Sequence, residues 1–248
     1  MKVKEIYSYI DKIAPFSTAM QGDNCGLLCG DSESEVTRAL VCLDITLAVV
    51  EEAHRLGCEL IISHHPIIFE PIRCVRAGTI PYELAHYGIT AICAHTNLDI
   101  SPVGTNAQLA KLLDLAAIEM IEGEAAAVGI LKHEMSVKSF AKQAKENLNA
   151  KGLRYLDCGK NIKRVGMCSG AGGDMLYRLA DKIDCFVTGE IKHHQIIDAQ
   201  SMGVSVLDLG HYRTEFIVCA PLCSMLSRNF SGVEFIVSQD NVDLMDYA

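Results

Sequence analysis

The stretch Leu60-Ile61-Ile62-Ser63-His64-His65-Pro66 is the part of the chain that most constrains its fold. The short apolar run is typical of a buried strand, and two adjacent histidines follow it. Neutral imidazole is the commonest protein metal ligand near neutral pH. Because successive side chains of an extended chain diverge, the two histidines suit two neighbouring ions better than one. A surface turn that holds two histidines is the alternative interpretation.

Similar apolar runs alternate with amphipathic segments on both sides of this stretch. The predicted strands are 39–43, 59–63, 89–94, 164–169, 185–188, 204–209 and 233–237. The predicted helices are 4–13, 46–56, 80–87, 105–113, 136–150, 174–182, 193–201 and 212–226. This alternation indicates parallel strands joined by crossover helices, and therefore an α/β fold.

The two halves of the chain follow the same order, one helix and then βα units, which suggests a structural duplication. Segment 119–129 is acidic and rich in Gly and Ala, so the boundary between the halves is predicted there. We expect a first α/β half at 1–125, which a C-terminal segment could complete, and a second α/β half at 126–248.

Bulk composition narrows the class of protein. The 248 residues, half of them hydrophobic, are enough for a substantial core. A formal net charge of -9 disfavours non-specific binding to nucleic acid. The N-terminus lacks the features of a signal peptide, and the longest apolar stretch, 216–226, is too short to cross a membrane as a helix. A cytoplasmic protein without membrane contact is expected.

The eleven cysteines are scattered, odd in number and without a Cys-x-x-Cys pair. This pattern predicts a reducing compartment and no disulfide framework. Cys25 with Cys29, and Cys219 with Cys223, are spaced like ligand pairs. Packing of the thiols in the core is the favoured interpretation of both.

Three predicted strands end in residue types that bind metals. His64 and His65 follow the first, His95 and Asp99 the second, and His211 and Glu215 the third. In open α/β sheets, ligands bind beyond the carboxyl ends of the strands. His211 and Glu215 are four residues apart at a helix start, so both side chains share one face.

These strand ends supply a mixed nitrogen and oxygen ligand set. It suits two divalent ions, with Zn, Fe, Mn or Co as candidates, because five ligands exceed one tetrahedral zinc site. Glu215 is predicted to bridge the ions, which in two-metal hydrolases lie about 3.5–4 Å apart. The predicted metal ligands are His64, His65, Asp99, His211 and Glu215.

Other residues are candidates for proton transfer. His95 could be a ligand, but a hydrogen bond to a ligand or substrate is favoured. Glu190 and His193 could work at the rim of the pocket, and a solvated helix start is the alternative. The glycine run 170–173 could hold an anion on its N–H groups, although a tight turn explains it equally well.

The motifs together resemble a known family. They are Asp23-Asn24-Cys25-Gly26-Leu27, Leu43-Asp44-Ile45-Thr46, Ser63-His64-His65-Pro66, His95-Thr96-Asn97-Leu98-Asp99, Thr188-Gly189-Glu190 and Gly210-His211-Tyr212-Arg213-Thr214-Glu215. In this order they resemble the NIF-three-like dinuclear metal-centre proteins, also known as GTP cyclohydrolase I type 2 homologues. The resemblance covers nearly the whole chain.

The resemblance implies two intertwined α/β halves with mixed sheets, two divalent ions per chain and a toroidal homohexamer. The family's ligand positions fall on the five residues already selected. Two hypotheses of function follow. One is a metal-dependent hydrolase of a nucleotide or another small phosphorylated or cyclic substrate, similar to GTP cyclohydrolase I type 2. The alternative is a non-catalytic metal-binding or regulatory hexameric scaffold.

Overall fold

The computed structural model describes residues 1–246, which form two compact units. Unit one comprises Met1–Leu98 and Val218–Val242, and unit two comprises Asp99–Ile217 and the segment that begins at Asp243. A C-terminal segment therefore completes the first unit. The division of the sequence into halves at 1–125 and 126–248 stays a prediction.

The sheet of unit one has five strands. They are β1 (Gly26–Cys29), β2 (Arg38–Cys42), β3 (Leu60–Ser63), β4 (Thr90–Cys93) and β11 (Glu234–Val237). The strand order is β1-β4-β3-β2-β11, with β4, β3, β2 and β11 parallel and β1 antiparallel to β4. Every residue of β3 and β4 is buried, which is usual for parallel strands covered on both faces.

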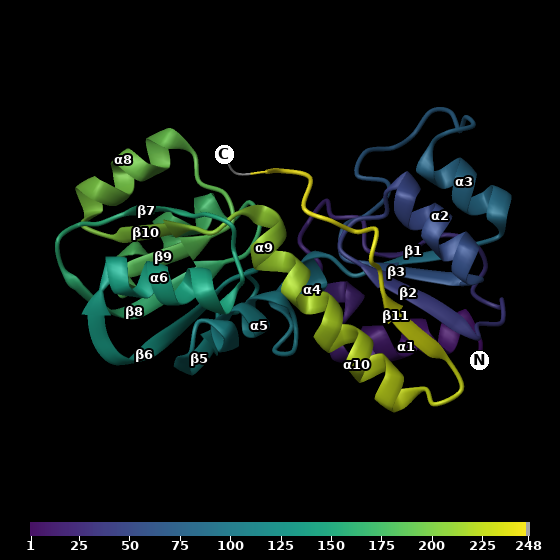
Figure 1. Cartoon of the computed structure of the whole chain (residues 1–248), viewed down its shortest axis with the longest axis horizontal. Helices are drawn as coiled ribbons and strands as arrows, with labels where there is room; N and C mark the ends of the chain where they lie inside the picture. Colours follow the sequence, from purple (N-terminus) through teal and green to yellow (C-terminus); the bar gives the residue numbers. More distant parts are fainter. Residues whose placement is uncertain (247–248) are drawn as a thin grey trace. The chain divides into compact units, whose positions relative to one another are not determined.

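Helices cover both faces of this sheet. They are α1 (Val3–Ile13), α2 (Leu47–Leu56), α3 (Ile80–Tyr87) and α10 (Cys219–Asn229). Apolar side chains of α2 and α3 share one core with β2 and β3. Figure 1 shows α1 and α10 on the opposite side of the sheet from α2 and α3, and α10 packs against β2 and β11. The short helix α4 (Thr96–Ile100) follows β4, and unit one passes into unit two within it.

The sheet of unit two has six strands. They are β5 (Leu115–Met120), β6 (Ala127–Ser136), β7 (Arg154–Leu156), β8 (Asn161–Cys168), β9 (Cys185–Thr188) and β10 (Ser205–Asp208). The order is β5-β6-β8-β9-β10-β7. Only β8, β9 and β10 are mutually parallel, and the other pairings are antiparallel.

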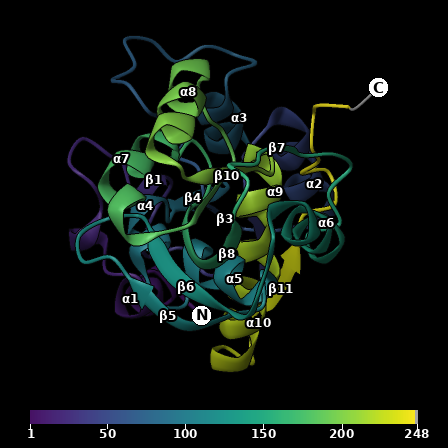
Figure 2. The same cartoon turned by 90° about the vertical axis from the view of Figure 1, so that its left-hand side faces the viewer.

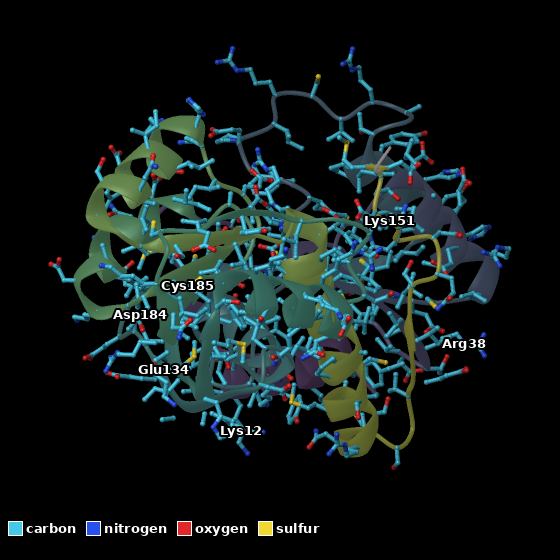
Figure 3. The ribbon with its side chains drawn as sticks, turned by 60° about the vertical axis from the view of Figure 1, so that its left-hand side comes forward. Lys12, Arg38, Glu134, Lys151, Asp184 and Cys185 are labelled. Atoms are coloured by element: carbon cyan, nitrogen blue, oxygen red, sulfur yellow. The ribbon has the colours of Figure 1, made fainter. Side chains whose placement is uncertain are left out.

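Most helices of unit two pack into two separate cores. The helices are α5 (Thr105–Leu112), α6 (Val137–Asn147), α7 (Leu176–Leu179), α8 (His193–Met202) and α9 (His211–Glu215). Residues of α5 and α6 form one core with the sheet, and residues of α7 and α8 form the other (Figure 2). The sheet is thus covered on both faces. Figure 3 labels Asp184 and Cys185, where the buried strand β9 begins.

The predicted α/β class with mixed sheets is confirmed, but four strands were not predicted. β1, β5, β6 and β7 all lie in antiparallel pairs. Segment 119–129, expected to be a connection, instead contains the turn between β5 and β6 and parts of both strands. In β5 only Leu115 is buried, and the strand pairs with β6 alone at the edge of the sheet.

The prediction of one continuous helix at 212–226 is wrong, because the helix is interrupted there. α9 ends at Glu215, a 3₁₀ turn covers Phe216–Val218, and α10 starts at Cys219. Pro221 has no N–H to donate to the carbonyl of Ile217, so a continuous α-helix would lose a hydrogen bond at this point. The predicted helix 174–182 is likewise shorter, with α7 flanked by 3₁₀ turns at Gly173–Met175 and Ala180–Lys182.

Two expectations from composition can be compared with the structure. All eleven cysteines are free thiols, and six of them are buried. Within residues 1–246, no helix combines the length and the apolar character needed to span a bilayer.

A buried carboxylate fixes the segment that follows β11. Glu52 on α2 is 2% exposed. Its carboxylate accepts hydrogen bonds from the backbone N–H groups of Gln239 and Asp240, at 2.9 and 3.2 Å, and from the Ser238 hydroxyl. The Asn241 side-chain oxygen then accepts the N–H of Leu43, just after β2, at 2.6 Å. These bonds attach the C-terminal segment to unit one.

The Glu52→Gln protein is expected to be less stable by about 1–3 kcal/mol, because the amide nitrogen cannot accept these hydrogen bonds and leaves buried donors unsatisfied. Urea unfolding with an unchanged m-value measures the loss. Glu51→Gln is the matched control: Glu51 is exposed on the same helix, and its replacement should change stability by less than about 0.5 kcal/mol. Equal midpoints for the two variants would contradict the assigned role of Glu52.

Candidate metal centre

The backbone holds the histidine pair of unit one in extended continuation of β3. The N–H of His64 donates to the Cys42 carbonyl at 3.1 Å, and the N–H of His65 donates to the Leu43 carbonyl at 2.9 Å. The two side chains therefore leave opposite sides of the strand end. His64 is 2% exposed, whereas His65 is partly exposed.

An oxygen atom fixes the orientation of each ring. His64 Nδ1 lies 2.9 Å from the Ala94 carbonyl oxygen, and His65 Nδ1 lies 2.7 Å from Asp44 Oδ1. A carbonyl or an ionised carboxylate oxygen can only accept, so Nδ1 carries the hydrogen in both rings. Nε2 is then the nitrogen with the lone pair. A histidine with Nδ1 bonded to an oxygen and Nε2 directed to a metal is the usual arrangement in metal sites.

His95 follows the same rule at the end of β4. Its Nδ1 lies 2.9 Å from Asp23 Oδ1. The other Asp23 oxygen accepts the Thr96 N–H at 3.1 Å and the Thr96 hydroxyl. The Asp23 carboxylate thus supports the histidine and the first residue of α4 together.

The surroundings of Asp23 favour its ionised form. Burial alone would raise the pKa of Asp23, but the hydrogen bonds from His95, Thr96 and Cys25 outweigh it and hold the pKa of this carboxyl well below its usual range. Asp23 is therefore an anion at neutral pH, which keeps the hydrogen of His95 on Nδ1.

The three imidazoles of unit one form a cluster. Their ring centroids are 5.1 Å apart for His64 and His65, 5.2 Å for His64 and His95, and 5.4 Å for His65 and His95. Ligand nitrogens from the three rings lie within 4.8 Å of one another. His95 is thus close enough to join the other two around an ion, in addition to its predicted role in proton transfer.

The loop after His65 brings an aromatic side chain to this cluster. The Asn24 side chain donates to the Ile68 carbonyl at 2.7 Å, which holds the loop near the start of β1. The Phe69 ring lies edge-on to His95, with centroids 6.0 Å apart, and is 62% exposed. One wall of the histidine cluster is therefore apolar.

Unit two supplies a second histidine and carboxylate pair, on α9. His211 Nδ1 lies 2.7 Å from Glu190 Oε1, and His211 Nε2 lies 2.8 Å from Glu215 Oε2. The four-residue spacing on one short helix places His211 and Glu215 on one face, as predicted. The Glu215 side chain is 5% exposed. Glu190 gives His211 the same Nδ1 support that Asp44 gives His65.

Two glycines leave room for this pair. Gly170 follows β8 with a positive φ of 60°, and a Cβ there would lie 1.9 Å from Glu215 Oε1 and 3.2 Å from His211 Nε2. At Gly189, after β9, a Cβ would lie 2.8 Å from the His211 Cα. The N–H of Gly170 donates to the Thr214 hydroxyl at 3.0 Å. The glycine run 170–173 therefore acts here as a tight turn with close packing.

The remaining predicted residues have distinct surroundings. Asp99 lies in α4 and is 6% exposed, and its carbonyl accepts a hydrogen bond from the Asn106 side chain. Glu190 is held by His211. His193 is exposed at the first residue of α8, and in the described part of the chain its side chain has no hydrogen bond or ion pair. Its catalytic role stays a prediction.

Sequence reasoning gave no role to Asp23 or Asp44, although both belong to motifs singled out in the sequence. Asp44 follows the end of β2, as the histidines follow β3 and β4. A carboxylate at a fourth strand end was the available signal. Asp23 lies in a turn before β1, where the sequence pattern gave no indication of its contact with His95.

The donor set fits divalent metal ions. In His64, His65 and His95 an oxygen acceptor at Nδ1 leaves Nε2 as the ligand nitrogen. In His211 an oxygen lies against each ring nitrogen, Glu190 Oε1 at Nδ1 and Glu215 Oε2 at Nε2. Nitrogen ligands with carboxylates suit first-row transition metals and zinc.

Comparison with known proteins gives one consistent result. The family model described as Duf34/NIF3 (NGG1p interacting factor 3) matches residues 1–243. A "GTP cyclohydrolase 1 type 2 homolog" of Campylobacter jejuni is 34% identical over 220 residues, covering 87% of this chain and 88% of the relative. A protein with the same description from Clostridium perfringens is 32% identical over 263 aligned residues, with both chains fully covered. The crystal structure of a Staphylococcus aureus hypothetical protein has a TM-score of 0.93 and 31% identity, covering 100% of this chain and 99% of the other.

Proposed function

Because the chain belongs to the Duf34/NIF3 family, we propose that it is a dinuclear metal-dependent hydrolase of a nucleotide or another small phosphorylated or cyclic substrate. The proposed ligands are His64, His65, Asp99, His211 and Glu215. The names of the relatives support a nucleotide substrate, since the C. jejuni and C. perfringens proteins are described as GTP cyclohydrolase 1 type 2 homologues.

One observation carries the proposal: an oxygen holds Nδ1 in each of four histidines, and Nε2 of one of them, His211, lies 2.8 Å from the proposed ligand Glu215. A histidine that only packs in a core has no need of this repeated arrangement. Three of the four oxygens belong to carboxylates, those of Asp44, Asp23 and Glu190, which make the imidazoles better ligands. Loss of such a partner typically lowers metal affinity or activity 10–100-fold.

Bound divalent ions would polarise the group under attack and acidify the attacking water. The chain's own residues have separate tasks. Asp44 and Glu190 hold the rings of His65 and His211. His95, with Asp23 at Nδ1, can accept or donate a proton at Nε2. The Phe69 ring lies edge-on to His95.

His193, the exposed first residue of α8, is the further candidate for proton transfer. We propose that its imidazole exchanges protons with the substrate or solvent and that it holds no metal. Its replacement by alanine should slow turnover without changing the metal content, and His194→Ala is the neighbouring control.

The experiment joins metal content to turnover. Protein purified without added metal is examined by elemental analysis and then assayed with Zn, Mn, Fe or Co on a panel that includes GTP, other nucleotides and phosphoesters. We expect two ions per chain and hydrolysis of at least one substrate class. The double variant His65→Ala/Glu215→Ala should lose both. His133→Ala, a change at an exposed histidine on β6, should retain both.

Turnover that survives in the double variant would refute the hydrolase. Two bound ions without turnover on the whole panel, together with a stable protein partner in pull-down, would favour the non-catalytic scaffold. Native mass spectrometry in the same experiment tests the proposed homohexamer.

A further inference from the structure

Unit two contains a small cavity that the proposed metal ligands do not use. Its volume is about 110 Å³. The walls are apolar and come from β7, β10 and the segment from the end of β9 into α8. They are formed by Leu156, Ile191, Ile196 and Val206. For comparison, an apolar cavity of about 150 Å³ in another protein stays dry and binds benzene.

Polar side chains also line the cavity. Arg154 and Asp208 line it, with Tyr155 beside them. Arg154 Nε donates to Asp208 Oδ2 at 3.1 Å, and Arg154 Nη2 donates to the same oxygen. The Arg154 side chain is 72% exposed and that of Asp208 is 11% exposed. A guanidinium has five N–H donors, so Arg154 can bind a further acceptor oxygen while it stays paired with Asp208.

Two residues that line the cavity, Ile191 and Asp208, are close in sequence to His211 or to the residue that holds its ring. Ile191 directly follows Glu190, whose carboxylate holds His211 Nδ1 at 2.7 Å. Consecutive Cα atoms are about 3.8 Å apart, so the cavity wall at Ile191 begins next to Glu190. Asp208 ends β10 and accepts the N–H of Gly210 at 3.3 Å, and His211 is the next residue.

We propose that this cavity is a ligand subsite for one aromatic ring or branched aliphatic group that carries an acceptor oxygen, as in a carboxylate or phosphate. The ring enters between Ile196 and Val206, and the oxygen is bound by Arg154. The identification of this ligand with part of the substrate rests on the proposed hydrolase function. The binding itself does not, because no metal ligand lines the cavity.

Ligand-observed NMR with simple probes tests the subsite on metal-free, full-length protein. The probes are benzoate and phenyl phosphate, with benzyl alcohol as the uncharged ring and inorganic phosphate as the anion without a ring. We expect all three ring compounds to bind, the anionic ones more tightly, and inorganic phosphate not to bind. Removal of metal should leave these affinities unchanged.

Two variants locate the binding. Ile196→Phe fills the cavity and should weaken every ring probe at least about tenfold. Ile197→Phe is the matched control, since Ile197 is the next residue of α8, is 51% exposed and does not line the cavity. Arg154→Gln should reduce the affinity for benzoate and phenyl phosphate to that of benzyl alcohol. Arg164→Gln, on β8, should leave all affinities unchanged.

The outcomes separate the two proposals. Ring probes that do not bind, or that bind equally to the Ile196→Phe and Ile197→Phe proteins when both are folded by circular dichroism, overturn the subsite. If the probes bind as expected but the protein hydrolyses no substrate, the subsite proposal is supported and the hydrolase proposal is refuted. Turnover whose KM rises in Ile196→Phe while kcat is retained supports both.

Discussion

Glu215→Ala protein is expected to retain fewer than two divalent ions per chain and to bind the remainder weakly. Glu215 is the proposed bridging carboxylate, its side chain is 5% exposed, and its Oε2 lies 2.8 Å from His211 Nε2. Its removal would take a ligand from both proposed ions at once. The affinity should fall by more than the roughly 10–100-fold that follows loss of an outer hydrogen-bond partner. Elemental analysis after dialysis and calorimetric titration with Zn or Mn measure the change.

The control for this variant is Glu134→Ala, because Glu134 is an exposed glutamate on β6 of the same unit and is labelled in Figure 3. It should bind metal like the unmodified protein. Glu215→Gln keeps the shape of the side chain but lacks the charge, so its metal affinity should lie between those of Glu215→Ala and Glu134→Ala. Two tightly bound ions in Glu215→Ala would show that this residue does not bridge them.

Gly170→Ala is expected to lower the free energy of unfolding by about 2–5 kcal/mol and to impair metal binding. The residue has a φ of 60°, and a left-handed conformation costs a residue with Cβ about 1–2 kcal/mol. The added methyl group would also lie 1.9 Å from Glu215 Oε1, and such overpacking costs about 1–3 kcal/mol more. Denaturant unfolding and metal titration measure the two effects.

Gly159→Ala is the control that separates backbone strain from steric collision of the added methyl group. Gly159 has a φ of 77°, and a Cβ there would meet nothing within 4 Å. This variant should lose only about 1–2 kcal/mol and keep its metal affinity. The double variant Gly170→Ala/Glu215→Ala should be more stable than the sum of its single changes implies, because the colliding carboxylate is absent. If the losses of stability in the two single variants are additive in the double variant, the destabilisation by Gly170→Ala comes from backbone strain alone.

The parallel core of each unit was predictable because its strands have a strong local signal. β3, β4, β9 and β10 are buried along their whole length, and each has at least two consecutive apolar residues at its centre. The candidate ligands follow directly, since parallel strands end at one edge of a sheet. The histidines after β3 and β4 could be selected without any structure.

The antiparallel strands β7 and β1 are harder to recognise from the sequence. β7 has three residues and is partly exposed, and β1 is four residues long with a register shift against β4. Their pairing depends on partners distant in sequence. The break between α9 and α10 was detectable in principle from Pro221, whereas the apolar periodicity of the segment favoured a single helix.

The supporting residues of the candidate site were harder to predict than the ligands. A carboxylate that holds a histidine needs no fixed sequence spacing: Asp44 is 21 residues from His65, and Asp23 is 72 residues from His95. Only the folded chain brings each pair together. The cavity beside β7 could not be predicted for the same reason, since its walls come from three separate segments.

The late arrival of β11 has a consequence for synthesis on the ribosome. β2 pairs with β11 along one edge, but roughly 190 residues separate the two strands, and translation at about 5–20 residues per second needs roughly 10–40 s to reach the partner. During that interval, the nascent first sheet exposes an unpaired strand edge, the kind of surface on which chains aggregate. We therefore expect this protein to depend on chaperones that act while it is still being translated.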